Sequence, residues 1–300
     1  MSQAAAPPVT RPIVQRRRGV LPSGRRPRVL IHVVIFLMMA VWLIPTIGLL
    51  LNSFRSSSDA ASSGWWTAIL PPYEFTIANY QTVLAQSGLG DAFVNSLFIA
   101  IPATVIPVVI AAFAAYAFAW MDFPYKNALF VVVVGLLVVP LQLTLIPVLR
   151  LFAGAGIAGS FLAVWLAHTG YGLPFAIYLL RNYMGGLPRE VFESAAIDGA
   201  SASTAFFRLA LPMSVPAIAS LAIFQFLWTW NDLLVSLIYI GSQVANQPLT
   251  LKVANLVNSQ GGGIHLLTAA AFVTMILPLV VFFALQRYFV RGITGGAVKG

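Results

Sequence analysis

Polar side chains interrupt one long apolar stretch near the C-terminal end of the sequence at the spacing of a helix. Counted from the first of them, they lie at offsets of three, seven and eleven residues, and they are Gln225, Trp228, Asp232 and Ser236. A carboxylate inside a bilayer costs roughly 2.5–3.5 kcal/mol and therefore faces a cavity or a protein partner. A polyhydroxylated solute suits such a stripe, because its hydroxyl groups pair with amide and carboxylate side chains, Asn231 included, while its apolar face lies on an aromatic ring. The stripe predicts a substrate path, with packing against a second subunit as an equal alternative.

The patterns that carry enzyme chemistry are missing from the sequence. It has no G-x-x-x-x-G-K-[ST] phosphate-binding loop, no cysteine and no carboxylate pair. His32, His168 and His265 are too scattered to give the spacing of metal ligands. We therefore expect no catalytic residue, no metal site and no cofactor in this chain. The T-G-Y-G segment at 169–172 lies inside a full-length apolar stretch, so it indicates a kinked helix near the substrate path rather than an ion-channel filter.

The elements that must position these residues are membrane helices. Apolar residues make up 59% of the 300 residues and charged residues 8%, with a mean hydropathy of +0.89, whereas soluble domains carry about 25% charged residues. About 20 apolar residues of helix cross a bilayer core. Six stretches qualify, which predicts an all-α membrane protein with six transmembrane helices. They are Val29–Leu51, Phe93–Trp120, Ala128–Leu149, Phe161–Leu180, Met213–Ile240 and Leu266–Leu285.

The distribution of basic residues predicts which ends of these helices face the cytoplasm. If the N-terminus is cytoplasmic, all but three of the 17 Lys and Arg residues fall on the cytoplasmic side, and the exceptions are Arg55, Arg150 and Lys252. Because basic residues favour that side, we expect both termini to be cytoplasmic. The net charge of +9 then reflects topology and contact with anionic lipid, not a nucleic-acid partner.

The same pattern divides the chain into segments. Residues 1–28 are predicted to be a basic, disordered cytoplasmic tail, 29–290 the six-helix membrane domain, and 291–300 a cytoplasmic C-terminal tail. The long loops 52–90 and 241–265 are expected outside, where an extracytoplasmic partner would meet them.

The predicted cytoplasmic loop between the fourth and fifth helices carries the most specific pattern. Pro188 suits the first position of a short helix, and Gly199 suits its C-terminal stop. Ser201 can cap a second short helix that Pro212 ends. The loop therefore predicts two short helices at the inner membrane face, although an ordinary amphipathic interfacial helix would also fit.

This loop resembles the signature of the permeases of binding-protein-dependent ABC importers. The signature reads E-A-A, three residues, G, nine residues and I-x-L-P, and the same spacing is kept here by Glu193-Ser194-Ala195, Gly199 and Leu209-Ala210-Leu211-Pro212. Ser194 replaces an alanine and Leu209 an isoleucine. Further segments are similar to the carbohydrate branch, specifically to permeases of the maltose-system type, within residues 71–300. They include Asn95-Ser96-Leu97, Leu173-Pro174-Phe175, Trp230-Asn231-Asp232 and Arg287-Tyr288-Phe289.

The resemblance implies the type I ABC importer permease fold and a set of partners in a bacterial or archaeal plasma membrane. A second related permease would complete the path, two cytoplasmic ATPase subunits would bind ATP and Mg²⁺, and an extracytoplasmic solute-binding protein would deliver a sugar. Within the coupling loop 187–212, the helix Pro188–Asp198 would dock on an ATPase subunit. The residues implied in coupling are Glu193, Ser194, Ala195, Asp198, Gly199, Leu211 and Pro212. The residues predicted for the substrate path are Gln225, Trp228, Asn231 and Asp232.

Other functions remain as alternatives. The same family contains permeases for other polar solutes. An ion-coupled secondary transporter commonly needs ionisable residues at the membrane midplane and inverted repeats, whereas these stretches hold almost no candidate besides Asp232. A structural membrane protein would not require the inner-loop signature.

Overall fold

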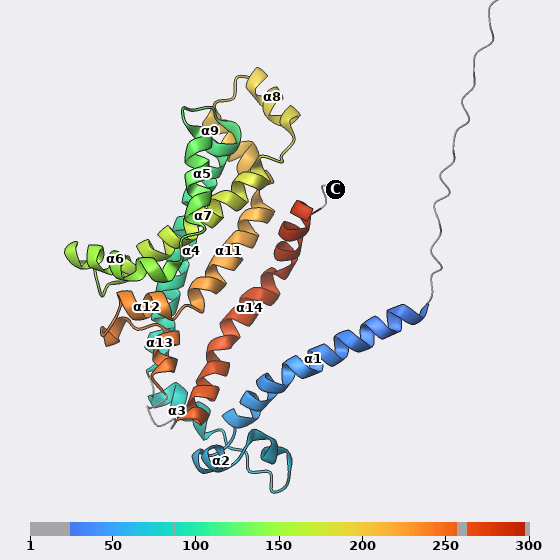
Figure 1. Ribbon diagram of the computed structural model, residues 1–300, viewed down its shortest axis with the longest axis vertical. Coiled ribbons are helices and arrows are strands. Elements are labelled where there is room, and N and C mark those ends of the chain that lie inside the picture. Colours follow the sequence, from blue (N-terminus) through green and yellow to red (C-terminus); the bar gives the residue numbers. More distant parts are fainter. Residues whose placement is uncertain (1–24, 87, 257–262, 298–300) are drawn as a thin grey trace, which may run out of the picture. The chain divides into compact units, whose positions relative to one another are not determined.

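The structure, a computed structural model, describes residues 25–86, 88–256 and 263–297 (Figure 1). Every regular element within these ranges is helical, as the composition predicts. The contacts divide the chain into two units, Met1–Ile47 and Gly48–Gly300. The elements are α1 (Arg25–Ser53), α2 (Ser57–Ser62), η1 (Trp65–Ile69), α3 (Ala78–Gln86), α4 (Leu89–Trp120), α5 (Lys126–Leu136), α6 (Leu141–Gly154), α7 (Phe161–Met184), α8 (Arg189–Ile197), α9 (Ala202–Ala205), η2 (Phe206–Ala210), α10 (Leu211–Met213), α11 (Val215–Trp230), α12 (Leu234–Tyr239), η3 (Val244–Asn246), α13 (Leu249–Ala254) and α14 (Ile264–Ala297).

Four of the predicted membrane helices are confirmed as continuous helices. Among the described residues, α1, α4, α7 and α14 are long and apolar enough to cross a bilayer, and two bent helix pairs raise the number of candidate spans to 6. The structure describes part of each predicted tail. Residues 1–24 lie outside the described residues, residues 25–28 begin α1, and α14 continues through Ala297.

The third predicted helix, Ala128–Leu149, is not one straight helix. It is α5 followed by α6, and the two axes are bent by 101°. Pro140 lies at the bend. It interrupts the helix because proline has no N–H to donate and disfavours helical geometry in the residue before it. The 11 residues of α5 give a length of about 17 Å, against a bilayer core of about 30 Å.

The fifth predicted helix, Met213–Ile240, is also broken. A bend of 71° at Ser214 separates α9–α10 from α11, and α11 ends at Trp230 before α12 begins at Leu234. The polar residues predicted to share one stripe therefore belong to two helices and to the segment between them.

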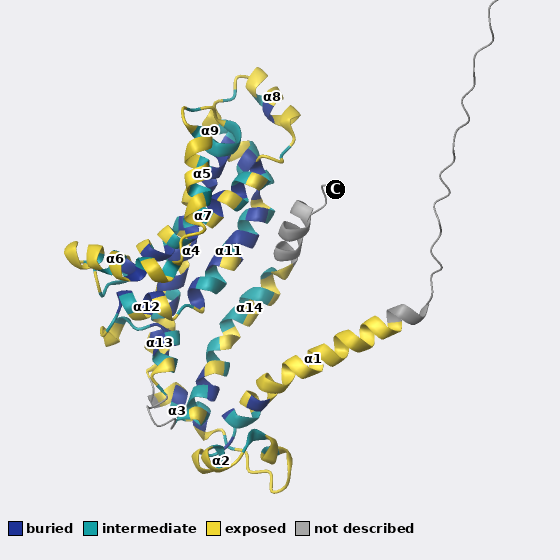
Figure 2. Cartoon of the chain, viewed as in Figure 1, coloured by how far each residue is buried: buried dark blue, intermediate teal, exposed yellow. Residues whose placement is uncertain are grey.

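The core of the unit Gly48–Gly300 lies where α4 packs along α7 and α11, and α11 packs along α14. The buried faces of α4 and α7 are rich in small residues. Figure 2 shows this interior as the buried parts of α4, α7 and α11. Small side chains let membrane helices approach closely, where dispersion and interhelical hydrogen bonds stabilise them. The fully buried alanines of α4 and α7 are Ala100, Ala103, Ala111, Ala115 and Ala163.

The other unit contains most of α1, and it has a different surface. Each residue of the segment 29–47 is exposed, and most of these residues are large and apolar (Figure 2). Water would penalise such a surface by about 25 cal/mol per Å², so hydrocarbon is the solvent that this helix fits.

Within the unit Gly48–Gly300, two pairs of short helices lie at opposite ends. Figure 1 places α8 and α9 at one end of the bundle and α2 and α3 at the other. The loop with the signature and the long loop 52–90 are therefore at opposite ends, as the predicted topology requires.

Candidate coupling surface and substrate path

The helix α8 forms as the sequence predicts. Pro188 precedes its first residue, and Ser194 Oγ donates to the Glu190 carbonyl at 2.8 Å. At its C-terminal end Gly199 has φ +78°. The Gly199 N–H donates to Ala196 O at 3.0 Å and the Ala200 N–H to Ala195 O at 2.9 Å. These two bonds form a Schellman motif, which requires the left-handed backbone that glycine adopts without strain.

A single side chain attaches α8 to the membrane bundle. Phe192 is the only buried residue of α8, and its ring stacks on Trp120 with centroids 3.9 Å apart and an interplanar angle of 19°. Trp120 ends α4, and its Nε1 donates to Met184 O at the end of α7 at 3.0 Å. Phe192 thus links α8 to the ends of two core helices. The sequence did not reveal that Trp120 contacts α8. The available signal was its position at the end of an apolar stretch.

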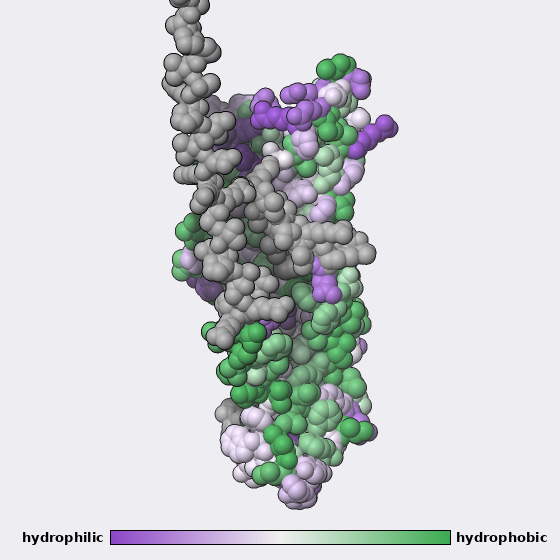
Figure 3. Space-filling model, turned by 90° about the vertical axis from the view of Figure 1, so that its right-hand side faces the viewer, coloured by the Kyte–Doolittle hydropathy of each residue, from purple (hydrophilic) through white to green (hydrophobic). Residues whose placement is uncertain are grey.

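The remaining surface of α8 faces away from the bundle. Glu193, Ser194 and Asp198 are exposed, while Ala195 is partly buried. Ile197 is 87% exposed, an unusual position for a large aliphatic side chain at a hydrophilic end of the molecule. Figure 3 shows hydrophilic side chains gathered at the upper end of the view, where α8 lies. A protein partner that covers this surface would bury Ile197.

The second part of the loop is longer than predicted. Ser201 caps α9 by accepting the Thr204 N–H at 3.2 Å, but Pro212 does not end the helical run, which passes through the π-helical turn η2 and α10 to Met213. Pro212 is tolerated because it lies in the first turn of α10. Phe206 stacks on Phe113 of α4, with centroids 4.7 Å apart. This segment is therefore also packed on α4, with Leu211 partly buried and Pro212 exposed.

Gln225 lies inside the bundle. It is 3% exposed, and its Nε2 donates to Ala103 O of α4 at 3.2 Å. A Cβ at position 172 would lie 2.7 Å from Gln225 Oε1, so Gly172 of α7 provides the space for this side chain. Gln225 therefore connects the three core helices α4, α7 and α11 within this chain.

Asp232 lies in the break between α11 and α12. Its carboxylate accepts the N–H groups of Val235 at 3.3 Å and Ser236 at 3.1 Å, so it caps α12 in the way that aspartate caps helices. Asn231 is exposed, and its Nδ2 donates to Leu227 O at 2.7 Å, at the end of α11. The side chains of the break therefore bond backbone groups at the end of α11 and at the start of α12.

His168 of α7 contacts this break, and sequence spacing gave no indication of it. Its Nε2 lies 3.6 Å from Asp232 Oδ2, and its side chain is 0% exposed. Its ring meets Trp228 edge-on, with centroids 5.1 Å apart at 86°. Neither ring nitrogen has a hydrogen-bond partner. The available signal was an ionisable residue in an apolar helix, which needs a partner inside the protein.

A cavity of about 380 Å³ opens beside Trp228. It lies where the bent pair α5 and α6 meets α7 and α11, and we call it the α5–α6 cavity. Its walls include Trp228, Tyr171 and Thr144 together with aliphatic side chains. The prediction that the T-G-Y-G segment lies in a helix is confirmed, because residues 169–172 belong to α7. Of the four predicted path residues, only Trp228 lines this cavity.

Comparison with known proteins identifies the family of this arrangement. Residues 107–295 match the family described as the binding-protein-dependent transport system inner membrane component. The chain belongs to this family.

Two relatives and one solved structure extend the match along the chain. The osmoprotective compounds uptake permease protein GgtD of Synechocystis sp. is 58% identical over 90% of this chain and 91% of that protein. The alpha-glucoside transport system permease protein AglG of Rhizobium meliloti is 55% identical over 83% of this chain and 68% of that protein. A chain of a bacterial ABC transporter involved in the import of the acidic polysaccharide alginate has the same fold, with a TM-score of 0.72 and 18% identity, over 89% of this chain and 98% of that chain.

The family match covers α8, both bent helix pairs and the break after Trp230, so the chain is a multi-pass membrane permease of an ABC importer. In such importers the ATPase is a separate subunit. The predicted resemblance to the permeases of binding-protein-dependent ABC importers is confirmed. The signature at Glu193–Pro212 is the part of the permease that the sequence alone made recognisable.

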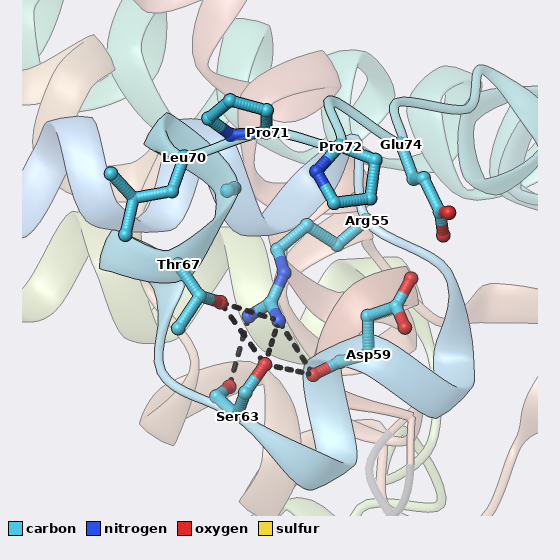
Figure 4. Close-up of a pocket in the computed structure, with 9 residues that line it drawn as sticks. Arg55, Asp59, Ser63, Thr67, Leu70, Pro71, Pro72 and Glu74 are labelled. Carbon is cyan, nitrogen blue, oxygen red and sulfur yellow. Dashed lines mark hydrogen bonds between the residues drawn. The ribbon is translucent and has the colours of Figure 1, made fainter.

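At the opposite end, the permease folds the loop after α1 around Arg55 (Figure 4). The Arg55 guanidinium is buried and donates to Asp59 O at 2.7 Å, Ser63 O at 2.9 Å, Thr67 Oγ1 at 3.3 Å and the Ser63 hydroxyl. It lines a pocket of about 350 Å³ with Glu74 among the other residues. Buried cations require such hydrogen bonds. Arg55 therefore orders this loop, which the sequence predicted only as an outer surface.

Proposed function

We propose that the permease imports a sugar or oligosaccharide, with a polyhydroxylated osmoprotective solute as the second candidate. The observation that carries this proposal is the identity over most of the chain with relatives named for alpha-glucosides and for osmoprotective compounds. An alpha-glucoside and a polyhydroxylated osmoprotective solute both carry many hydroxyl groups, which polar and aromatic side chains recognise together.

The proposed complex has the partners that the resemblance implies. A second related permease completes the path, and two cytoplasmic ATPase subunits bind ATP and Mg²⁺. An extracytoplasmic binding protein delivers the solute to the end that carries α2, α3 and the Arg55 loop. Both chain termini and α8 then face the cytoplasm of a bacterium. The clustering of basic residues on one side of the predicted topology supports this orientation.

Coupling proceeds through α8 in this proposal. Glu193, Ser194 and Asp198 supply polar contacts to the ATPase subunit, and Ile197 fills an apolar pocket on it. Ala195 permits close approach, and Gly199 turns the chain toward α9 and the segment that contains Leu211 and Pro212. When the ATPase pair closes on ATP, α8 moves as a rigid body and carries α4 and α7 with it through Phe192. The Trp120 stack and the Met184 hydrogen bond support this role.

The substrate path in this proposal passes the end of α11. Trp228, Asn231 and Asp232 flank it at the helix break, where irregular backbone is tolerated beside a cavity. Gln225, nearly two turns earlier, holds α11 against α4 and so fixes the width of the path. The partly exposed positions of Trp228 and Asp232 support this placement.

Uptake by the reconstituted complex tests the function. The two permeases, the ATPase and the binding protein are placed in proteoliposomes with maltose, sucrose, trehalose or glucosylglycerol outside. We expect uptake of at least one of them that requires ATP and the binding protein. Uptake driven by a proton or sodium gradient without ATP would instead favour an ion-coupled transporter that uses the His168–Asp232 pair.

A further inference from the structure

The α5–α6 cavity combines an aromatic wall with hydroxyl groups inside the bundle. Its volume of about 380 Å³ falls within the range of about 300–1,000 Å³ typical of small-molecule sites. The bend of 101° between α5 and α6 creates its aliphatic wall, and α7 and α11 contribute the polar and aromatic residues. A site that only packs against lipid needs no hydroxyl groups, so these groups favour a polar occupant.

The hydroxyl groups form a connected set. Thr144 Oγ1 lies 2.7 Å from Leu141 O and 3.1 Å from Tyr171 Oη, and Tyr171 Oη lies 2.7 Å from Tyr239 Oη. A phenolic oxygen can take part in three hydrogen bonds. Tyr171 uses two of them within the protein, so its oxygen has one position left for a solute hydroxyl. Both Tyr171 and Thr144 line the cavity.

Trp228 contacts the buried side chain of His168. Its indole lines the cavity, while His168, which is fully buried, contacts the same indole edge-on at 5.1 Å. His168 is itself fixed by Asp232, which caps α12. The unpartnered ring nitrogens of His168 show that hydrogen bonding does not explain its place. His168 contacts the Trp228 indole and the Asp232 carboxylate.

We propose that the α5–α6 cavity is a saccharide subsite in which Trp228 stacks on the apolar face of a sugar ring, Tyr171 bonds a sugar hydroxyl, and His168 is the positioning residue for Trp228. The inference rests on the proposed function and adds to it a place and a recognition chemistry within this subunit. It assigns sugar contact to Tyr171, which lies outside the polar stripe on α11.

The experiment uses the complete reconstituted complex with saturating binding protein and radiolabelled maltose, an alpha-glucoside. Two quantities are measured: the uptake rate, and the maltose retained by complexes trapped with ATP and vanadate. Trp228→Ala should lower both by roughly three- to tenfold, because a stacked aromatic pair is lost, while Trp228→Phe loses less. Tyr171→Phe, which deletes one oxygen, should lower maltose retention by about threefold or more.

Matched variants separate a subsite from a structural role. Tyr178→Phe makes the same change on α7 away from the cavity and should leave maltose retention at the wild-type level. His168→Ala should reduce retention as Trp228→Phe does, whereas His168→Phe, which keeps an aromatic edge against the indole, should restore it. A merely structural His168 would change thermal stability without this rescue of retention.

Three results would overturn the inference. If Trp228→Ala and Tyr171→Phe retain maltose like the wild type, the cavity is not a saccharide subsite. If these variants separate the two permeases, the cavity is a packing surface for the partner subunit. The third result is a wild-type complex that couples ATP hydrolysis to its binding protein but transports none of the four solutes of the uptake experiment. The proposed substrate class would then be wrong, and so would the saccharide subsite. The first two results leave the proposed function intact, so the failures are distinguishable.

Discussion

At the residue scale, Phe192 is the side chain on which attachment of α8 depends. Phe192→Ala removes a buried ring stacked on Trp120 and should cost about 3 kcal/mol of local stability. We expect basal ATP hydrolysis by the complex to persist and solute-stimulated hydrolysis to fall at least tenfold. Phe207→Ala, at a side chain that is 56% exposed on the neighbouring segment, should keep most of the stimulation. Equal losses in both variants would contradict the special role of Phe192.

Ile197 belongs to the same surface and tests its docking. Because its side chain is 87% exposed, Ile197→Ser should leave the thermal stability of the isolated permease within about 0.5 kcal/mol of the wild type. Affinity for the ATPase subunit, measured by titration in detergent, should fall about tenfold if the partner buries this side chain. Val191→Ser, on the same helix, serves as the control. Unchanged affinity for Ile197→Ser would place the interface elsewhere.

The sequence predicted most of α8 but little of the cluster around Trp228. Capping residues act locally, so Gly199 and Ser201 could be recognised from their neighbours, and the structure confirms the role of each. His168 and Asp232 are far apart in sequence and meet only because α7 packs on α11 and α12. Trp120 and Phe192 meet for a similar reason, at the ends of different elements. Such contacts follow from tertiary packing, which a single sequence does not display.

At the element scale, the α5–α6 bend and the break after Trp230 flank the proposed substrate path. The α5–α6 bend lies at Pro140, a proline inside the predicted span Ala128–Leu149 and therefore a position where the sequence favours an interruption. The break after Trp230 has no proline. It depends on Asp232, which caps α12 and contacts His168, so hydropathy alone could not reveal it.

The capping of α12 by Asp232 and its contact with His168 make separable contributions. Asp232→Asn keeps an oxygen that can cap α12 but removes the charge near His168, whereas Asp232→Ala removes both. The alanine variant should therefore be less stable than the asparagine variant by about 1 kcal/mol. Thermal unfolding of the solubilised complex measures the difference. Identical melting temperatures for the two variants would mean that the cap contributes nothing to α12.

At the scale of the whole molecule, the two ends of the Gly48–Gly300 unit should face opposite sides of the membrane. The chain has no cysteine, so single cysteines report their side without background from this subunit. Ser57→Cys and Ser242→Cys should react with an impermeant thiol reagent added to intact cells, and Ser201→Cys should react only after lysis. The three positions are exposed, so access to the reagent depends on the side of the membrane. Labelling of Ser201→Cys in intact cells would reverse the proposed orientation.

The central claim is that α8 couples solute delivery to ATP hydrolysis, and Gly199→Pro tests it most directly. Gly199 has φ +78° and its N–H donates to Ala196 O, whereas proline fixes φ near −65° and has no N–H. Gly156→Pro is the matched control, because Gly156 has φ +71° and a similar bond to Ala153 O after α6. The measurement is ATP hydrolysis by the reconstituted complex with and without loaded binding protein. We predict that Gly199→Pro inserts and assembles but loses stimulation, while Gly156→Pro keeps it, and full stimulation in Gly199→Pro would contradict the account.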